Sequence, residues 1–256
     1  MRKPMNNDGT VMHLSGEIIS DEYAWLYGWF GIDCTTPGQI NEALRNAAGR
    51  PITVKVDSPG GMISAGAAMY EAMMDYAGQV TFEITTAHSA ASFVTMASAK
   101  AGNVSKISPL GLMGIHNAQG GAEGDYHDMD QAAQHLRAGT QAVVNAYRLK
   151  TGMPEEQLRE LMDNVTMFSA QEALNMGMVD EIMHQDGENK LEFSEEQLTA
   201  VKNRMGAMMN TFSIPSKLAL KKMQAVLKPD QPGDTPDKDD VYKQQKALLE
   251  IERCKY

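Results

Sequence analysis

The sequence predicts an α/β domain over residues 1–184, in which strands alternate along the chain with helices that cover them. Short runs rich in β-branched and aromatic residues are separated by longer stretches whose small and apolar residues recur at helical spacing. Three of the predicted strands end in loops that carry glycine, serine or histidine. Because ligands and catalytic groups gather at the carboxyl ends of strands in open α/β folds, these loops form the candidate functional region.

Strand, turn and helix units make up the first half of this domain. Alternating β-branched positions predict the strands, and alanine and methionine at helical spacing predict the helices. The expected elements are a strand over 52–56, a turn over 57–61, a helix over 64–76, a strand over 80–86, a helix over 87–100 and a short strand over 112–116 that opens into a glycine-rich loop.

A long helix is predicted over 128–150. It ends near Gly152, which can adopt the left-handed conformation that often follows a last helical turn. Pro154 then suits the first turn of a second helix, over 155–162.

Ser169 and Glu172 have the spacing of a capping box, so a third helix is expected to begin near residue 170 and to stop at Gly177. A strand over 179–183 closes the domain.

The character of the chain changes after residue 184. Two amphipathic helices are expected, over 194–209 and 216–228. The proline, glycine and aspartate of the following segment cannot bury a core. The predicted organisation is therefore a compact domain over 1–184, a helical extension over 185–228, a flexible linker over 229–240 and a short C-terminal helix or tail over 241–256.

The composition is that of a soluble enzyme or an assembly protein. The 256 residues are 43% hydrophobic and 22% charged, which allows one large core or two small ones. A net charge of −10 argues against a surface for nucleic acid or anionic membrane, which would need clustered Lys and Arg. No run of about 18 apolar residues is present, and the first 20 residues lack the apolar segment of a signal peptide. With only Cys34 and Cys254, we expect a cytoplasmic location, no disulfide framework and no cysteine metal site.

Methionine is unusually frequent, with 20 residues, while aromatic residues make up 6% of the chain. Its unbranched thioether fills irregular gaps and adapts at contact surfaces. We therefore interpret the methionines of the domain as filling of the core and of subunit interfaces rather than as a metal or cofactor signal.

The loops hold the parts of a nucleophilic hydrolase. Such an enzyme needs a nucleophile, a histidine base, an orienting carboxylate and backbone N–H donors aimed at the developing oxyanion. Ser89 sits where a strand passes into a helix, and His116 stands at a loop mouth after a strand. The backbone N–H groups of Ala90, Gly60 and Gly61 are candidate oxyanion donors. Each residue alone also has a structural explanation, because such a serine is usually a helix cap and a strand-end histidine is usually structural. We expect the other histidines His88, His127 and His135 on the surface or on a helix face.

Four motifs stand in a specific order along the chain, namely DSPGG at 57–61, HSAAS at 88–92, MGIHNAQGGAEG at 113–124 and MFSAQEALNMGMVDEI at 167–182. Together they closely resemble the ClpP family of serine peptidases, and its phage and prophage branch more than the housekeeping enzyme. The resemblance covers residues 16–183. It implies a crotonase-like ClpP fold of stacked β/α repeats, in which 128–150 falls at the protruding handle helix.

The resemblance implies a role for each site residue. Ser89, the first serine of the helix start, matches the nucleophile, with Ser92 three residues on as its nearest rival. His116 matches the general base. The implied oxyanion donors are Gly60, Gly61 and Ala90.

The acidic member of the triad departs from the family pattern. An ungapped comparison puts Val165 at the family's aspartate position, just before the FSA segment. Asp163, in LMDNVT, resembles the MDxxT pattern of phage relatives and is predicted to complete the triad. If the Asp163 carboxylate points away from His116, Asn164 or a backbone carbonyl could orient the imidazole.

The activity implied is that of a serine endopeptidase that works by acyl transfer, with no metal and no cofactor. The chain has no G-x-x-x-x-G-K-[ST] loop, so no ATPase is built in and any unfolding must come from a separate unfoldase. The resemblance further implies a homo-oligomeric ring, a polypeptide substrate such as a capsid or scaffold protein, and a role in phage head maturation or prophage-encoded proteolysis in the host cytoplasm.

Two other functions are also compatible with the sequence. Crotonase-fold enzymes that act on acyl-thioesters also use paired N–H oxyanion holes, although they would not need Ser89 and His116 at this spacing. Alternatively, the chain is an assembly or scaffold protein with a vestigial protease core whose tail binds capsid subunits.

Overall fold

A single sheet organises the part of the chain that the computed structural model describes, which is residues 10–185. The strand order is β2-β1-β3-β4-β5-β6, and β7 pairs with β5 beside this path. All pairs are parallel except β5 with β6. The strands are β1 (Val11–Ile18), β2 (Cys34–Thr35), β3 (Ile52–Gly61), β4 (Val80–His88), β5 (Val104–Ile115), β6 (Thr166–Ser169) and β7 (Glu181–Ile182).

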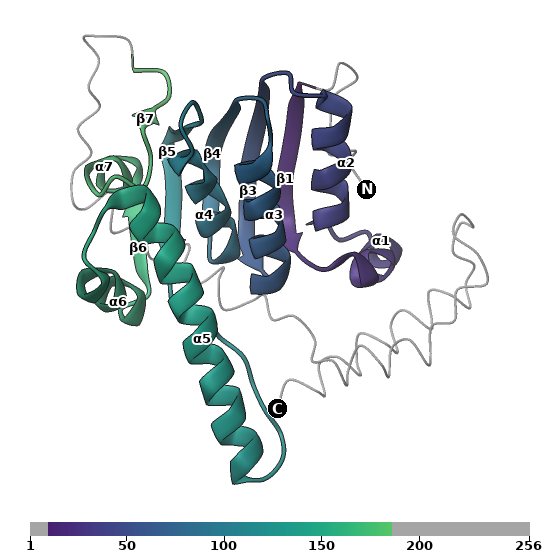
Figure 1. The fold of residues 1–256 in the computed structure, drawn as a ribbon, viewed down its shortest axis with the longest axis vertical. Helices are drawn as coiled ribbons and strands as arrows, with labels where there is room; N and C mark the ends of the chain where they lie inside the picture. The colour runs from purple at the N-terminus through teal and green to yellow at the C-terminus, as the bar shows by residue number, and fades with distance from the viewer. Residues whose placement is uncertain (1–9, 186–256) are drawn as a thin grey trace. The chain divides into compact units, whose positions relative to one another are not determined.

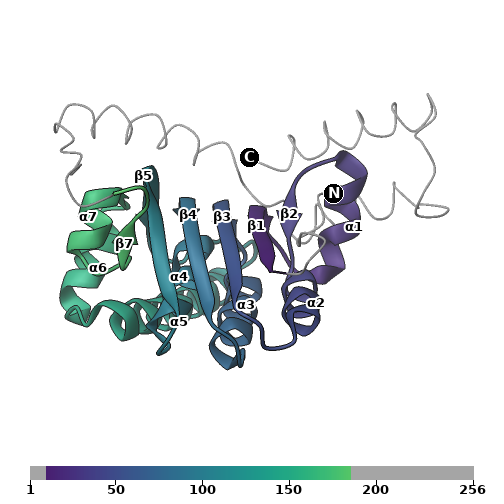
Figure 2. The ribbon, with the colours of Figure 1, turned by 90° about the horizontal axis from the view of Figure 1, so that it is seen from above.

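Helices cover one face of this sheet. Figure 2 shows α2, α3, α4 and α5 on the same side of the strands, with α6 and α7 beyond the β5 edge. The helices are α1 (Ala24–Phe30), α2 (Pro37–Ala47), α3 (Ile63–Asp75), α4 (Ala90–Thr95), α5 (Tyr126–Thr151), α6 (Glu155–Asp163) and α7 (Ala170–Asn175), with 3-10 turns η1 (Asp21–Tyr23) and η2 (Met96–Ala99). This is the predicted α/β architecture of strands alternating with helices.

The core lies between the sheet and the helix layer. Inward residues of β3 and β4 such as Val54 and Phe82 are fully buried, and they belong to one cluster with Met69 and Met73 of α3. Six methionines of the expected core are at most 1% exposed, whereas Met129 is 43% exposed. The core members of this set are Met69, Met73, Met96, Met113, Met162 and Met178.

The opposite face of the sheet carries charged residues in cross-strand register. Lys55 of β3 lies beside Glu83 of β4, which lies beside Lys106 of β5. Lys106 in turn forms an ion pair with Glu181 of β7, with 2.7 Å between Nζ and Oε2. All four side chains are at least partly exposed, as expected for a sheet face that no helix of residues 10–185 covers.

The strands extend further than the sequence predicts at their functional ends. The segment expected as a turn over 57–61 continues β3, because Gly61 pairs with Ile18 of β1. Only glycine fits there, since a Cβ on Gly61 would lie 2.1 Å from the Ile18 carbonyl oxygen. Likewise β4 runs on through His88, and β5 begins at Val104 rather than at residue 112.

The predicted C-terminal half is confirmed closely. α5 ends at Gly152 in the left-handed conformation (φ 69°), and the Ser169–Glu172 capping box begins α7. Figure 1 shows the N-terminal part of α5 running past the end of the sheet, where its residues are exposed. The elements expected over 194–209, 216–228, 229–240 and 241–256 lie outside the described residues.

Candidate active site

Ser89 occupies a strained corner between β4 and α4. Its backbone has φ 50° and ψ −122°, a conformation that non-glycine residues rarely adopt. Its N–H donates to the carbonyl of Gly114 in β5 at 3.0 Å, which joins the corner to the strand that leads to His116. A serine held at a sharp turn from strand to helix projects its hydroxyl from the carboxyl edge of the sheet, the arrangement that nucleophilic serines use.

Ser92, the rival nucleophile, is fully buried. Its Oγ lies 2.7 Å from the carbonyl oxygen of Ser89 and 2.7 Å from the hydroxyl of Tyr147 in α5. Burial also raises the pKa of Tyr147, so this hydroxyl stays neutral and available for hydrogen bonding. Ser92 is therefore a structural link between α4 and α5, while the partly exposed Ser89 is accessible.

Gly60 brings the end of β3 against the serine corner. A Cβ on Gly60 would lie 2.5 Å from the His88 carbonyl oxygen and 2.6 Å from Ser89 Cβ, so no side chain fits. The Gly60 N–H donates to Ser58 Oγ at 3.1 Å, and Ser58 Oγ donates to the Gly16 carbonyl at 2.6 Å.

Of the three predicted oxyanion donors, Gly60 thus already has a partner. Ala90 is the first residue of α4, so its N–H has no acceptor within the helix. The structure brings Gly60 within close range of Ala90, since a Cβ on Gly60 would be 2.8 Å from the Ala90 nitrogen.

His116 follows β5 directly and is partly exposed. Its Nδ1 lies 2.6 Å from the carbonyl oxygen of Asn117. A carbonyl can only accept, so Nδ1 carries the proton and Nε2 presents a lone pair. This is the tautomer that a general base needs.

Asp163 is the last residue of α6 and is exposed. Its Oδ1 accepts a hydrogen bond from Asn117 Nδ2 at 2.6 Å, so the structure pairs it with Asn117 rather than with His116. Asn164 caps α6 through its backbone N–H. A backbone carbonyl, that of Asn117, orients the His116 imidazole, and the place of Asp163 in a triad stays a prediction.

His88, the residue before Ser89, was expected on a surface or a helix face, and this expectation is wrong. It is 1% exposed, and neither ring nitrogen has a hydrogen-bond partner among the described residues. Burial, with a smaller contribution from the nearby His116, lowers the pKa of His88 to about 4. A neutral imidazole therefore stands behind the nucleophile. By contrast, His127 and His135 are exposed on α5 as expected.

Two residues that shape the site, Ser58 and Asn117, were not predicted from the sequence. Ser58 continues the alternating inward row of Val54 and Val56 in β3, so a buried hydroxyl could have been read from the period of two. Asn117 offered no signal except its place next to His116.

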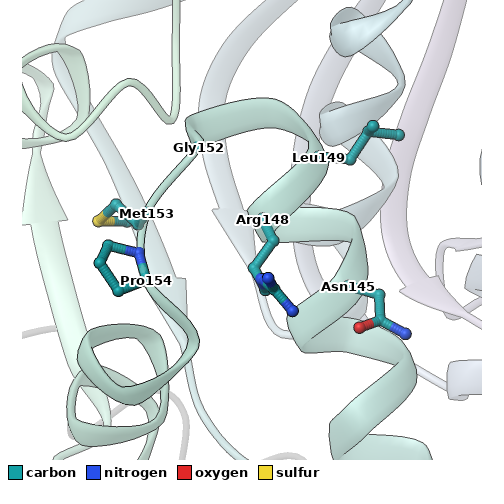
Figure 3. Close-up of a pocket in the computed structure, with 6 residues that line it drawn as sticks. All are labelled: Asn145, Arg148, Leu149, Gly152, Met153 and Pro154. Carbon is teal, nitrogen blue, oxygen red and sulfur yellow. The ribbon is translucent and has the colours of Figure 1, made fainter.

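A shallow hollow lies elsewhere, where α5 meets α6 (Figure 3). Arg148 of α5 extends along it and pairs with Glu155 at 3.1 Å. No predicted site residue lines the hollow. Its lining residues are Asn145, Arg148, Leu149, Gly152, Met153 and Pro154.

Within residues 10–185, no three metal-binding side chains cluster, and no helix is both long and apolar enough to cross a membrane.

The chain is similar to known proteins of one family. Residues 39–186, more than half of the chain, match the Clp protease family. Similar relatives are the ATP-dependent Clp protease proteolytic subunits of three strains of Dehalococcoides mccartyi. Each is 34% identical over 142 residues, which is 55% of this chain and 70% of the relative. The predicted α/β fold of a Clp protease domain is confirmed, and the chain belongs to the Clp protease family.

Proposed function

We propose that this protein is a serine endopeptidase that hydrolyses peptide bonds by acyl transfer from Ser89. The observation that carries the proposal is the corner at Ser89, which is partly exposed, strained, packed against Gly60 and hydrogen-bonded to the strand that ends at His116. The burial of Ser92 supports Ser89 over Ser92 as the proposed nucleophile.

The proposed reaction proceeds in two stages. The Ser89 Oγ forms a bond to the substrate carbonyl carbon while its proton passes to His116 Nε2. The carbon–nitrogen bond then breaks, and the leaving amine takes that proton. Water repeats the sequence on the acyl-enzyme, giving the free acid and restoring Ser89.

The oxyanion would be held by backbone N–H groups, and Ala90 and Gly61 are the donors that we favour. Gly60 serves better as the residue that allows the close approach, because its own N–H is used by Ser58. Loss of one oxyanion donor typically costs about 3–4 kcal/mol of transition-state stabilisation.

Asp163 is the proposed acidic member. Its pairing with Asn117 leaves two arrangements: direct contact with His116 after a side-chain change, or an indirect effect through Asn117.

We propose a homo-oligomeric ring and a separate ATP-driven unfoldase as partners. Support comes from the family match and from the relatives, whose name describes them as proteolytic subunits of an ATP-dependent protease. In this proposal the exposed part of α5 is the handle, the peptidase domain ends near residue 184, and residues 185–256 form the extension, linker and tail. The substrate is a polypeptide, with capsid or scaffold protein as the phage-related candidate, processed in the cytoplasm of the host.

A fluorophosphonate probe tests the nucleophile. The full chain should be labelled, and the Ser89→Ala variant should lose the label. The Ser92→Ala variant should keep it, which makes Ser92 the matched control three residues away. Labelling that disappears in Ser92→Ala but survives in Ser89→Ala would contradict the proposal.

A vestigial protease core with an assembly role is the second candidate, favoured by the engagement of Asp163 with Asn117. It predicts no labelling of the wild-type chain in any assembled state.

A further inference from the structure

Asn117 is the residue that links the two parts of the site. Its backbone carbonyl accepts from His116 Nδ1 and its side-chain amide donates to Asp163, each at 2.6 Å. One residue thus holds the imidazole with its main chain and the carboxylate with its side chain.

The carboxylate end of this link is anchored in the core. Asp163 ends α6, and that helix is fixed by Leu158 and Met162, which are at most 1% exposed. A hydrogen bond to an ionised carboxylate is roughly twice as strong as one between neutral groups. The amide of Asn117 is therefore tied to a rigid element, although the pair itself is exposed.

The imidazole end of the link determines which nitrogen of His116 can act as the base. Because the Asn117 carbonyl requires a proton on Nδ1, His116 presents Nε2 as the base. Rotation of the Asn117 peptide would remove this requirement. The hydrogen bond that the Asn117 side-chain amide donates to Asp163 restrains that rotation.

We propose that Asn117 is a positioning residue that passes the restraint of Asp163 to His116, in place of direct contact between carboxylate and imidazole. This inference rests on the proposed function of Ser89 and His116. It assigns to Asp163 an anchoring role one residue removed from the reacting groups.

Labelling rates with the fluorophosphonate probe test the link through a double-mutant cycle. Asn117→Ala and Asp163→Ala should each slow labelling about tenfold, the value of one hydrogen bond to a charged group. The double variant should be no slower than either single variant, since both remove the same link. Gln119→Ala, an exposed neighbour in the same loop, is the matched control and should keep the wild-type rate.

The Asp163→Asn variant distinguishes an indirect effect of Asp163, through Asn117, from direct contact between Asp163 and His116. Its neutral amide oxygen can still accept from Asn117, so labelling should slow only about threefold and the acid limb of the pH–rate profile should move by less than about 0.5 unit. Direct contact with His116 predicts a loss of about 10⁴-fold in the labelling rate and a larger movement of the acid limb. The latter result, or additive single losses in the cycle, would overturn the proposal.

A measurement independent of labelling is the tautomer of His116, read from ¹⁵N chemical shifts of the folded chain. We expect a proton on Nδ1 in the wild type, with some protonation of Nε2 instead in Asn117→Ala and Asp163→Ala. A wild type protonated on Nε2 would overturn the link. If the wild type is not labelled at all, the proposed function fails, and the tautomer still decides the role of Asn117.

Discussion

The two sides of the site are held in different ways. The nucleophile side, made of Ser58, Gly60 and Ser89, is fixed by close backbone packing between β3 and β4. The base side, made of His116, Asn117 and Asp163, is held by one partly buried and one exposed hydrogen bond. The nucleophile side cannot move without disrupting the sheet, whereas the base side can rearrange at the cost of these two hydrogen bonds.

The strained backbone therefore lies on the nucleophile side, at Ser89, and the geometry that can change lies on the base side, at His116. Ser89 keeps its unusual backbone conformation because buried neighbours on both strands surround it. The base side includes the exposed hydrogen bond between Asn117 and Asp163, which can break without opening the core. Any change that aligns or misaligns the site should therefore act on His116 and its neighbours.

The largest effect is expected for Gly60→Ala. The new Cβ would meet backbone atoms of His88 and Ala90 at 2.5 and 2.8 Å, at a residue whose φ is 95°. We expect a loss of about 3 kcal/mol or more in the free energy of unfolding, together with loss of probe labelling. Thermal unfolding should show a midpoint lower by about 6–12 °C for a domain of this size.

Gly121→Ala is the matched control on the base side, because nothing lies within 4 Å of a Cβ there. Its thermal midpoint should stay within about 1 °C of the wild type. Equal destabilisation by the two substitutions would contradict the contrast between a packed and an open side.

The next effect is a dependence of stability on pH that comes from His88. Its folded-state pKa is lowered to about 4 from the ordinary value of 6.5, so the unfolded state binds more protons between these two values. Stability is fully present above pH 6.5 and falls as the pH drops toward 4, by about 3 kcal/mol in total. Urea unfolding between pH 7 and pH 4 measures this slope.

His88→Leu removes the titrating group while keeping a buried apolar side chain. Whatever its stability at pH 7, its unfolding free energy should fall less between pH 7 and pH 4 than that of the wild type. Identical slopes would show that His88 gains a partner or solvent when the protein titrates.

The sequence allowed the nucleophile side to be predicted better than the base side. The motif around Ser89 and the glycine pair of β3 are local signals, because a positive φ and a close backbone approach both demand particular residues. The core methionines and the helix caps were likewise readable from spacing. His88 was misread because the strand was predicted to end at residue 86, whereas β4 continues through His88 and buries its side chain.

The contact between Asp163 and Asn117 could not be predicted, because it depends on the side-chain rotamers of two residues in separate segments, one at the end of α6 and one after β5. Asp163 and Asn117 are 46 residues apart in the chain, and their contact follows from how α6 packs against α5 and β6. Spacing within one motif contains no information on such a pair. The direction of the Ser58 hydroxyl was readable in principle, but its acceptor on Gly16 lies 42 residues away in β1.

The smallest expected effect is a gain of stability on the base side. Val165, between α6 and β6, has φ 48° and is 47% exposed. A left-handed conformation costs an ordinary residue roughly 1–2 kcal/mol, and asparagine tolerates it better than a β-branched residue. Val165→Asn should therefore raise the free energy of unfolding by about 1 kcal/mol, seen as a midpoint higher by about 2–4 °C. Val165→Gly should gain less, because glycine also loses more conformational freedom on folding. A lower midpoint for Val165→Asn would mean that the valine side chain contributes packing that its exposure does not show, and that the base side is held more firmly than its two hydrogen bonds imply.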